Sequence, residues 1–471
     1  MQNLFILFCK FSCFNALDPH MRRLIRDAGK DDVIWWPFIT SFLFIGQIVS
    51  SCSAQWLTDR IGRRDVTVVL KNLLALFAYA CVFTAALLGI PELLLFGRTI
   101  IGIVTIQTYV SGVLMSECAP TSCRGQVGTI PILGERLWLI LGILLCTPQL
   151  GCTDSNWQYR LLIPAIPTLV HLSAIIWLPR SPKYLFITKG RRGDALKSIL
   201  FYHGKHTDAA EVFHHYDMER HLIDDSTQQH VSWREMITHR HLRTAMLLCI
   251  LVYLSRPTSG PDLANMYSTH ILRESHVPDD KAALYAALFT QVPAMLAGIT
   301  STLLVERCGR RPLLFTGYAT GIAGCTTLFF SKLFHPPGES FLCVASVSMI
   351  LSGVALGPTM LESIVVGEIC VQAIRMSVFS IAFLFDNITS FIILSTYPIM
   401  SALIGPYTLL PVVTVATVIF ALLFLYLPES KGKNVDNITE MWMDTAEIKV
   451  AEEAVDQDEL LVDETEVKIS I

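Results

Sequence analysis

Long apolar runs recur from one end of the chain to the other, and they constrain its fold more than any other feature. A helix of about 20 mainly apolar residues crosses a bilayer's hydrocarbon core. Runs of this kind lie at 34–57, 67–90, 93–116, 126–148, 158–178, 244–271, 282–305, 313–331, 341–369, 376–400 and 405–427. Only 16% of the residues are charged and 52% are hydrophobic, whereas about a quarter are charged in an ordinary soluble domain. The sequence therefore predicts an all-α polytopic membrane protein and excludes a soluble multidomain enzyme.

Residues 1–14 form a further, shorter apolar stretch. Three interpretations compete for it: a truncated first helix, the apolar core of a signal peptide, or a complete tilted helix that extends to Leu17. A signal peptide has a basic start and a small-residue cleavage site, and neither is visible here. We therefore expect a short or clipped first helix.

Lys and Arg gather in alternate connections between the runs, which marks those connections as cytoplasmic. The connections are 59–64, the one around Arg124, 179–243, 306–311, the one around Arg375, and 431–433. The segment 20–32 is an exception, because it carries four basic residues on the expected outer side. We expect four parts: an N-terminal helical bundle at 1–180, a cytoplasmic linker at 181–243 with short helices at 193–202 and 209–225, a C-terminal bundle at 244–442 and an acidic tail at 443–471.

Several motifs occur twice at a nearly constant offset, which indicates an internal duplication. The D/E-R-x-G-R-R pattern at 59–64 returns at 306–311, an offset of 247 (306 − 59). Glu117 precedes Arg124 by seven positions, as Glu368 precedes Arg375, at an offset of 251 (368 − 117). Two similar six-helix halves are the parallel repeat expected of a rocking transporter.

We interpret the repeated residues as a cytoplasmic gate. Glycine in each motif permits a tight reversal between spans, and the arginines can pair with the nearby glutamates when the inner side closes. The alternative is that the arginines only keep their loops inside. The predicted gating residues are Asp59, Arg60, Gly62, Arg63, Arg64, Glu117, Arg124, Glu306, Arg307, Gly309, Arg310, Arg311, Glu368 and Arg375.

The same motifs carry a family resemblance. The chain reads DRIGRR at 59–64, GRTIIG at 97–102, ECAPTSCRG at 117–125, PRSPKYL at 179–185 and ERCGRR at 306–311, and PESKGK begins at 428. From about residue 34 onwards, the chain resembles the sugar-porter branch of the major facilitator superfamily, and in particular animal facilitative glucose transporters. The resemblance implies twelve helices in two bundles, a central substrate site and alternating access.

The residues that would choose the substrate match this family only in part. Where glucose-transporting relatives place a glutamine in the fifth helix, this chain has Ile132. The seventh-helix run reads RPTSGPD at 256–262, so two glutamines are lost, although Ser259 and Gly260 match. The expected tryptophan of the tenth helix is Ser363, whereas Asn387 matches the polar run of the eleventh.

In return, the chain carries ionisable residues at membrane depth, where they are costly and mark a pathway or a buried pair by default. These residues are Arg256, Asp262, Glu362, Glu135 and Arg136. Arg256 and Asp262 flank Pro257 and Pro261, where a broken helix would expose backbone to a cavity. The candidate substrate-binding residues are Arg256, Ser259, Asp262, Glu362 and Asn387. The alternative is that the charges pair with one another and only fix helix packing.

The sequence contains no nucleotide-binding glycine loop, nucleophile elbow or metalloprotease motif, so it predicts no catalytic residues, cofactor or metal site. A net charge of −4 gives no support to nucleic-acid binding. We expect a transporter of a hexose-like sugar or other small polar solute, which works by facilitated diffusion in the plasma membrane. The alternatives are a transporter of a charged organic solute and a non-transporting sensor or binding protein. The expected partners are that solute and the lipid bilayer, and the sequence gives no oligomeric state.

Overall fold

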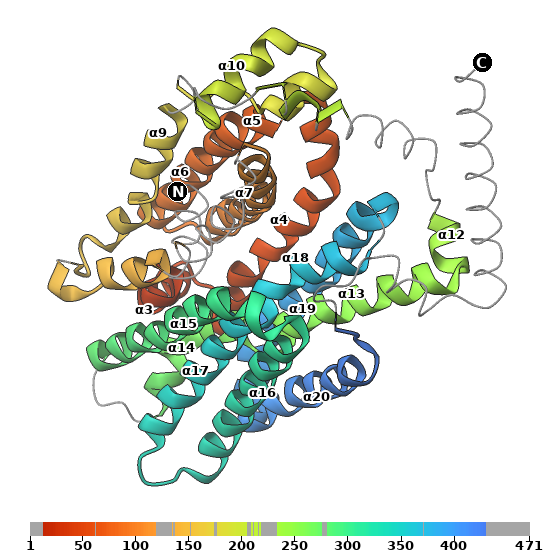
Figure 1. Cartoon of the computed structure of the whole chain (residues 1–471). Coiled ribbons are helices and arrows are strands. Elements are labelled where there is room, and N and C mark those ends of the chain that lie inside the picture. The colour runs from red at the N-terminus through yellow and green to blue at the C-terminus, as the bar shows by residue number, and fades with distance from the viewer. Residues whose placement is uncertain are drawn as a thin grey trace, which may run out of the picture.

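The computed structural model is built of helices arranged in two bundles (Figure 1). It describes residues 13–61, 63–118, 134, 137–150, 152–173, 177–204, 209–210, 212–214, 216–217, 233–275, 280–370 and 372–429. No strand occurs among these residues. The predicted all-α class is confirmed.

The N-terminal bundle lies in the upper part of Figure 1, coloured from red to yellow. Its elements are α2 (Cys13–Ala16), α3 (Asp18–Asp27), α4 (Asp32–Ile61), α5 (Arg63–Asp65), η2 (Val66–Leu70), α6 (Lys71–Leu88), α7 (Pro91–Cys118), η3 (Pro148–Leu150), η4 (Trp157–Leu162) and α9 (Ala165–Ser173). Residues 137–145 are helical as well. Of the predicted short first helix, only residues from 13 onwards are described.

The C-terminal bundle follows in green and blue. Its elements are α13 (Arg240–Thr258), α14 (Pro261–Glu274), α15 (Asp280–Cys308), α16 (Arg310–Phe334), α17 (Glu339–Leu356), α18 (Pro358–Ile369), α19 (Gln372–Ile404), η7 (Gly405–Thr408) and α20 (Leu409–Tyr426). Two predicted runs, 244–271 and 341–369, are each two helices that meet at a Gly-Pro pair. Proline lacks the N–H that would continue the ladder, so both spans break there.

Six helical stretches of the described residues are long and apolar enough to cross a membrane. They are Asp32–Ser53, Val66–Leu88, Leu284–Val305, Arg310–Phe334, Glu339–Leu356 and Ser377–Tyr426, the last of which contains two of the predicted runs. Such helices suit a bilayer because each satisfies its backbone hydrogen bonds internally.

The linker carries a small core of its own beside the N-terminal bundle. We call the end of each bundle on the side of the linker its inner end, and the opposite end its outer end. The helix predicted at 193–202 is present as α10 (Arg192–Tyr202), between η6 (Tyr184–Thr188) and α12 (Trp233–Thr238). The core consists of Leu185, Phe186, Ala195, Ile199, Phe213 and Tyr216. The Tyr202 hydroxyl donates to the Pro179 carbonyl at 2.8 Å and so ties α10 to the bundle. The helix predicted at 209–225 is described at only seven residues, and the acidic tail lies outside the described residues.

Glycines bring helix backbones into direct contact within each bundle. A Cβ on Gly102 of α7 would collide with the Leu43 carbonyl of α4, and one on Gly46 of α4 would collide with Thr99. In the other bundle, Gly317 of α16 faces the Gly353 carbonyl of α17 in the same manner. The glycines of the GRTIIG motif therefore have a packing role, since only glycine leaves room for the neighbouring backbone.

The described buried side chains form two large apolar cores that divide the molecule along the membrane normal. The first joins residues of α4, α6 and α7 to the outer half of the C-terminal bundle, through α14, α15 and the outer part of α19. The second belongs to the inner half of the C-terminal bundle, around α13, α18 and α20, and includes Met236 of α12 from the linker. Among the described residues, the two bundles thus share a core only at their outer ends, and Figure 1 shows them diverging toward the linker end.

Candidate transport site

A break in the seventh span places two opposite charges at the centre of the site. Gly260 has a φ of +85°, in the left-handed region that favours glycine, and it separates α13 from α14. Arg256 lies in the last turn of α13 and Asp262 in the first turn of α14. A cation at a helix C-terminus and an anion at an N-terminus both complement the helix dipole. The two helix ends at the break therefore stabilise the charges of Arg256 and Asp262.

Arg256 is bonded to two buried carboxylates. Its Nε and Nη2 donate to the two oxygens of Asp386 at 2.9 and 2.7 Å, and its Nη1 lies 3.2 Å from both oxygens of Asp262. The side chains of Asp262 and Asp386 are only 5% and 2% exposed. A two-pronged pairing of this kind fixes the guanidinium in orientation as well as in position.

Ser390 closes the network from the eleventh span. It lies one helical turn after Asp386 on α19, so both side chains face α13 and α14. Its Oγ donates to Asp262 at 2.7 Å and accepts from Arg256 Nη2 at 3.2 Å. The four residues therefore join α13, α14 and α19 at membrane depth. Sequence reasoning missed Asp386, although a carboxylate ten positions inside the apolar run 376–400 was a signal for it.

The other three candidate residues take different positions. The Glu362 carboxylate, on α18, is close enough to act electrostatically on Arg256. Ser259 donates to carbonyls of its own helix, Ser255 at 2.9 Å and Arg256 at 2.8 Å. Asn387 is fully buried and donates to the Phe383 carbonyl at 2.6 Å. The side chains of Glu135, Arg136 and Ser363 lie outside the described residues, as does Ile132.

An amide pair beside this network was not anticipated. Gln291 of α15 donates through Nε2 to Oδ1 of Asn265 on α14 at 3.3 Å, and both side chains are buried. Within the described part of the chain, Oε1 of Gln291 has no hydrogen-bond partner. Asn265 follows Asp262 by three positions, so both lie on one face of α14. The sequence shows the spacing of Asp262 and Asn265, but only the folded structure shows that Gln291 of α15 is the partner of Asn265.

Polar contacts join the two bundles at their outer ends. Asn15 Nδ2 donates to Ser268 Oγ at 2.7 Å, and the Thr269 N–H donates to Asn15 Oδ1 at 3.2 Å. The hydroxyls of Thr40 and Tyr267 lie 2.8 Å apart. Because these contacts link α2 and α4 to α14, they close the outer side of the molecule.

A buried arginine lies behind these outer contacts. Arg98 of α7 is fully buried, with its guanidinium 4.1 Å from the centre of the Phe14 ring. Its Nη2 donates to the Thr40 carbonyl at 3.4 Å and lies 3.9 Å from Met266 Sδ of the other bundle. The residue belongs to the GRTIIG motif, but it was not among the predicted site residues.

At the inner end of the C-terminal bundle, the repeated motif forms a compact cluster. Gly309 turns the chain with a φ of +90° between α15 and α16. Arg310 Nη2 lies 2.8 Å from Oε1 of Glu368, which joins α16 to α18. Glu429 accepts from the backbone N–H groups of Arg310 and Arg311 at 3.0 and 3.1 Å, so it caps the start of α16. In the sequence, Glu429 stands out only as a residue of the PESKGK motif, and its capping role is visible only in the structure.

The matching cluster of the N-terminal bundle is described only in part. Arg64 Nη1 lies 3.5 Å from Oδ1 of Asp65, and Arg180 Nη2 lies 2.6 Å from Oδ2 of the same carboxylate. Arg60 and Arg307 are exposed. Two residues of the predicted gate lie outside the described residues, Gly62 and Arg124. The same holds for five side chains, those of Asp59, Arg63, Glu117, Glu306 and Arg375. Each described ion pair of the predicted gate thus lies within one bundle.

No group of three or more His, Cys, Asp or Glu side chains among the described residues has the arrangement to hold a metal ion. Five cysteines of the apolar runs are buried and unbridged: Cys81, Cys146, Cys249, Cys325 and Cys343.

Two bundles that share a core at one end, with a buried polar network at a broken helix of the C-terminal bundle, are the features of a membrane transporter of the major facilitator class. The chain matches the family model described as "Sugar (and other) transporter" over residues 3–442. It therefore belongs to that family and is a multi-pass integral membrane protein, not an enzyme.

Known relatives agree with this assignment. The chain is 27% identical over 433 residues to the human "Solute carrier family 2, facilitated glucose transporter member 7". This alignment covers 90% of this chain and 83% of the relative. It is 26% identical over 409 residues to member 9 of that family from mouse, with 84% and 74% covered. The inward open structure of the xylose transporter XylE from E. coli has a TM-score of 0.76 at 16% identity, over 94% of this chain and 98% of that one, and shows the same fold.

Proposed function

We propose that the protein moves a hexose-like sugar, or a closely similar small polar solute, across the plasma membrane by facilitated diffusion. The family and the names of the relatives support a sugar as the solute. The observation that carries the proposal is the buried network of Arg256, Asp262, Asp386 and Ser390, because it sets polar groups at the point where the seventh span breaks.

The state of Arg256 favours a neutral solute over a free organic anion. All three of its donor nitrogens already bond to Asp386, Asp262 or Ser390. An arginine with two carboxylates offers no net positive charge to an anion. Carboxylate, amide and hydroxyl groups can instead accept and donate to sugar hydroxyls, and we assign this role to Asp262, Glu362 and Asn387, with Ser259 and Arg256 holding the local backbone and charges.

We further propose that access alternates between the two sides. The contacts of Asn15 and Tyr267 close the outer side in the present arrangement. The Arg310–Glu368 pair lies within one bundle in the present arrangement, so in the opposite state these residues and the other predicted gating residues would have to contact the facing bundle to hold the inner side closed. The core that the two bundles share at their outer ends supports a closed outer side in the present arrangement.

The test is uptake of labelled glucose and fructose into proteoliposomes that contain the purified full chain, with protein-free liposomes and labelled L-glucose as controls. We expect saturable uptake of a D-hexose that is unchanged by an imposed pH gradient. Uptake that follows the gradient would refute facilitated diffusion. Folded protein that takes up neither sugar would refute the hexose assignment and favour a charged solute or a non-transporting role.

A further inference from the structure

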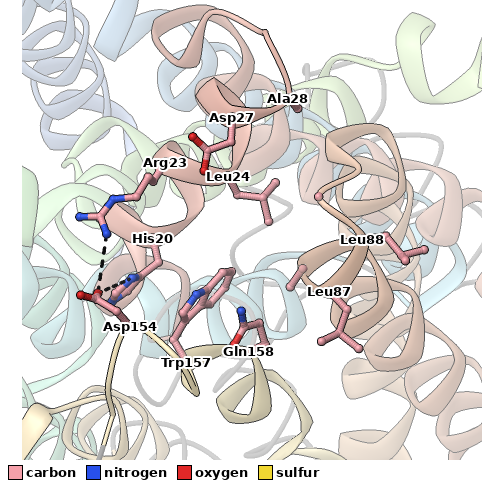
Figure 2. Close-up of a pocket in the computed structure, with 12 residues that line it drawn as sticks. His20, Arg23, Leu24, Asp27, Ala28, Leu87, Leu88, Asp154, Trp157 and Gln158 are labelled. Atoms are coloured by element: carbon pink, nitrogen blue, oxygen red, sulfur yellow. Dashed lines mark ion pairs between the residues drawn. The ribbon is translucent and has the colours of Figure 1, made fainter.

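A pocket of about 450 Å³ opens at the outer end of the N-terminal bundle (Figure 2). Three segments that are distant in sequence line it: α3, the end of α6 with Gly89, and residues 154–158. None of its lining residues belongs to the transport site described above.

One wall of the pocket carries charges of both signs. Arg23 and Asp27 lie four positions apart on α3, and Asp154 faces Arg23 from the neighbouring turn. The Arg23 side chain is 60% exposed, and its Nη1 is 3.8 Å from the Asp154 carboxylate, which is itself 79% exposed. Such a solvated pair is weakly held. Arg23 can therefore turn toward a ligand anion, while the two carboxylates remain for a ligand cation.

The opposite wall is apolar and lies at the membrane surface. Leu87 and Leu88 are 54% and 64% exposed, and they end the apolar stretch Val66–Leu88, which is long enough to cross the bilayer. The exposed Tyr159, whose ring lies 5.8 Å from that of Phe83, stands at the same level. Aromatic side chains of this kind concentrate where hydrocarbon meets the head groups. The pocket therefore spans that boundary.

The floor of the pocket does not suit a free sugar. Trp157 is 6% exposed, and its ring is stacked against that of His20, with the ring centroids 5.5 Å apart and an angle of 11° between the ring planes. A pyranose ring usually packs on an open aromatic face, and this face is already covered.

We propose that the pocket binds the zwitterionic head group of an outer-leaflet phospholipid. Arg23 bonds the lipid phosphate, the carboxylates of Asp27 and Asp154 face its quaternary ammonium, and Leu87 and Leu88 contact the start of the acyl chains. Charges of both signs beside exposed leucines fit an ammonium phosphate with a hydrocarbon tail better than they fit an anionic lipid or a soluble ion.

The experiment measures binding to the full chain purified in a maltoside detergent. The ligands are a short-chain diacyl phosphocholine, the matching diacyl phosphoglycerol, and free phosphocholine. We expect the phosphocholine lipid to bind most tightly, and we expect Arg23→Ala to weaken its binding about tenfold. Arg26→Ala is the matched control, because Arg26 is an exposed arginine of the same helix that does not line the pocket.

Leu88→Ala tests the apolar wall, with Leu73→Ala as its control, since Leu73 is a similarly exposed leucine of α6 outside the pocket. Equal binding of free phosphocholine would overturn the lipid assignment, and equal binding of the anionic lipid would overturn the role of Asp27 and Asp154. An equal loss in Arg23→Ala and Arg26→Ala would show a general surface charge effect and overturn the site. Thermal unfolding of each variant establishes that it is folded.

Discussion

Arg256 shows how one residue can hold three helices and still leave the site polar. It bonds carboxylates from α14 and α19 together with a hydroxyl, and each partner is buried. In a low-dielectric interior, a buried ion pair contributes modestly as a whole, but removing one member leaves a charge without compensation. Variants at this residue therefore report on structure and on transport together.

We expect Arg256→Gln to lower the free energy of unfolding by about 3–5 kcal/mol, because it strands two buried carboxylates. The double variant Arg256→Gln with Asp386→Asn should recover part of this loss, since it removes one of the two stranded charges. Thermal unfolding in detergent measures both. Uptake by the double variant then separates the roles: unchanged uptake of every solute would mean that the network only fixes helix packing.

His20, on the outer helix α3 and outside the spanning segments, gives a pH-dependent contribution to stability. Burial lowers its pKa below the ordinary value of 6.5, and the nearby Asp154 opposes this shift only in part. The folded state thus prefers neutral histidine, so its contribution is complete above pH 6.5 and is lost as the pH falls through the lowered pKa. We expect the melting temperature to fall more steeply below pH 6 in the native chain than in His20→Gln, and parallel curves would contradict this.

At the scale of helices, close contact between backbones makes each bundle stiff. Gly46 and Gly102 let α4 and α7 touch, and Gly317 and Gly353 do the same for α16 and α17. Small residues at such crossings are the usual basis of helix association in membranes. Movement between states is then expected at the breaks and turns, such as the one at Gly260, and not within these pairs.

Gly102→Val is expected to destabilise the N-terminal bundle by about 1–3 kcal/mol or more, because its Cβ would meet the Leu43 carbonyl, which cannot move aside as a side chain could. Gly193→Val is the matched control, since a Cβ there meets nothing within 4 Å. Thermal unfolding of the two variants gives the comparison. Equal melting temperatures would show that α4 and α7 can separate at no cost.

The sequence predicted the helices better than the contacts between them. Apolar runs of span length marked the helices, and the prolines beside Gly260 marked the broken one. Arg256 and Asp262 were found because charges stand out inside such runs. Asp386 stands out in the same way inside the run 376–400 and was overlooked. Gln291 was not found because its role depends on a partner 26 positions away, and no local period encodes that separation. The duplication singled out the arginines of the predicted gate, yet the backbone cap from Glu429 required the folded arrangement.

For the molecule as a whole, the described contacts between bundles lie on the outer side. Asn15 bonds Ser268 and Thr269, and Thr40 meets Tyr267. If solute enters from that side, these contacts must part during each cycle. The inner half of the C-terminal bundle has its own core, so it can move without losing its packing.

A disulfide across the outer contacts should therefore stop transport. In the double variant Asn15→Cys with Ser268→Cys, oxidation would join α2 to α14, and we expect uptake to fall at least tenfold and to return after a reducing agent is added. The two single-cysteine variants control for the native cysteines. Full uptake by the crosslinked protein would mean that the outer side need not open.

The division between the shared outer core and the small separate core of the linker has a consequence for how the polypeptide is connected. None of the described residues of the shared core comes from 177–243, and α10 packs around a core of its own. The two halves thus recognise each other through surfaces that do not include the tether between them. Two polypeptides divided within that tether and produced together would contain every described residue of the shared core, so we expect them to assemble without the covalent link.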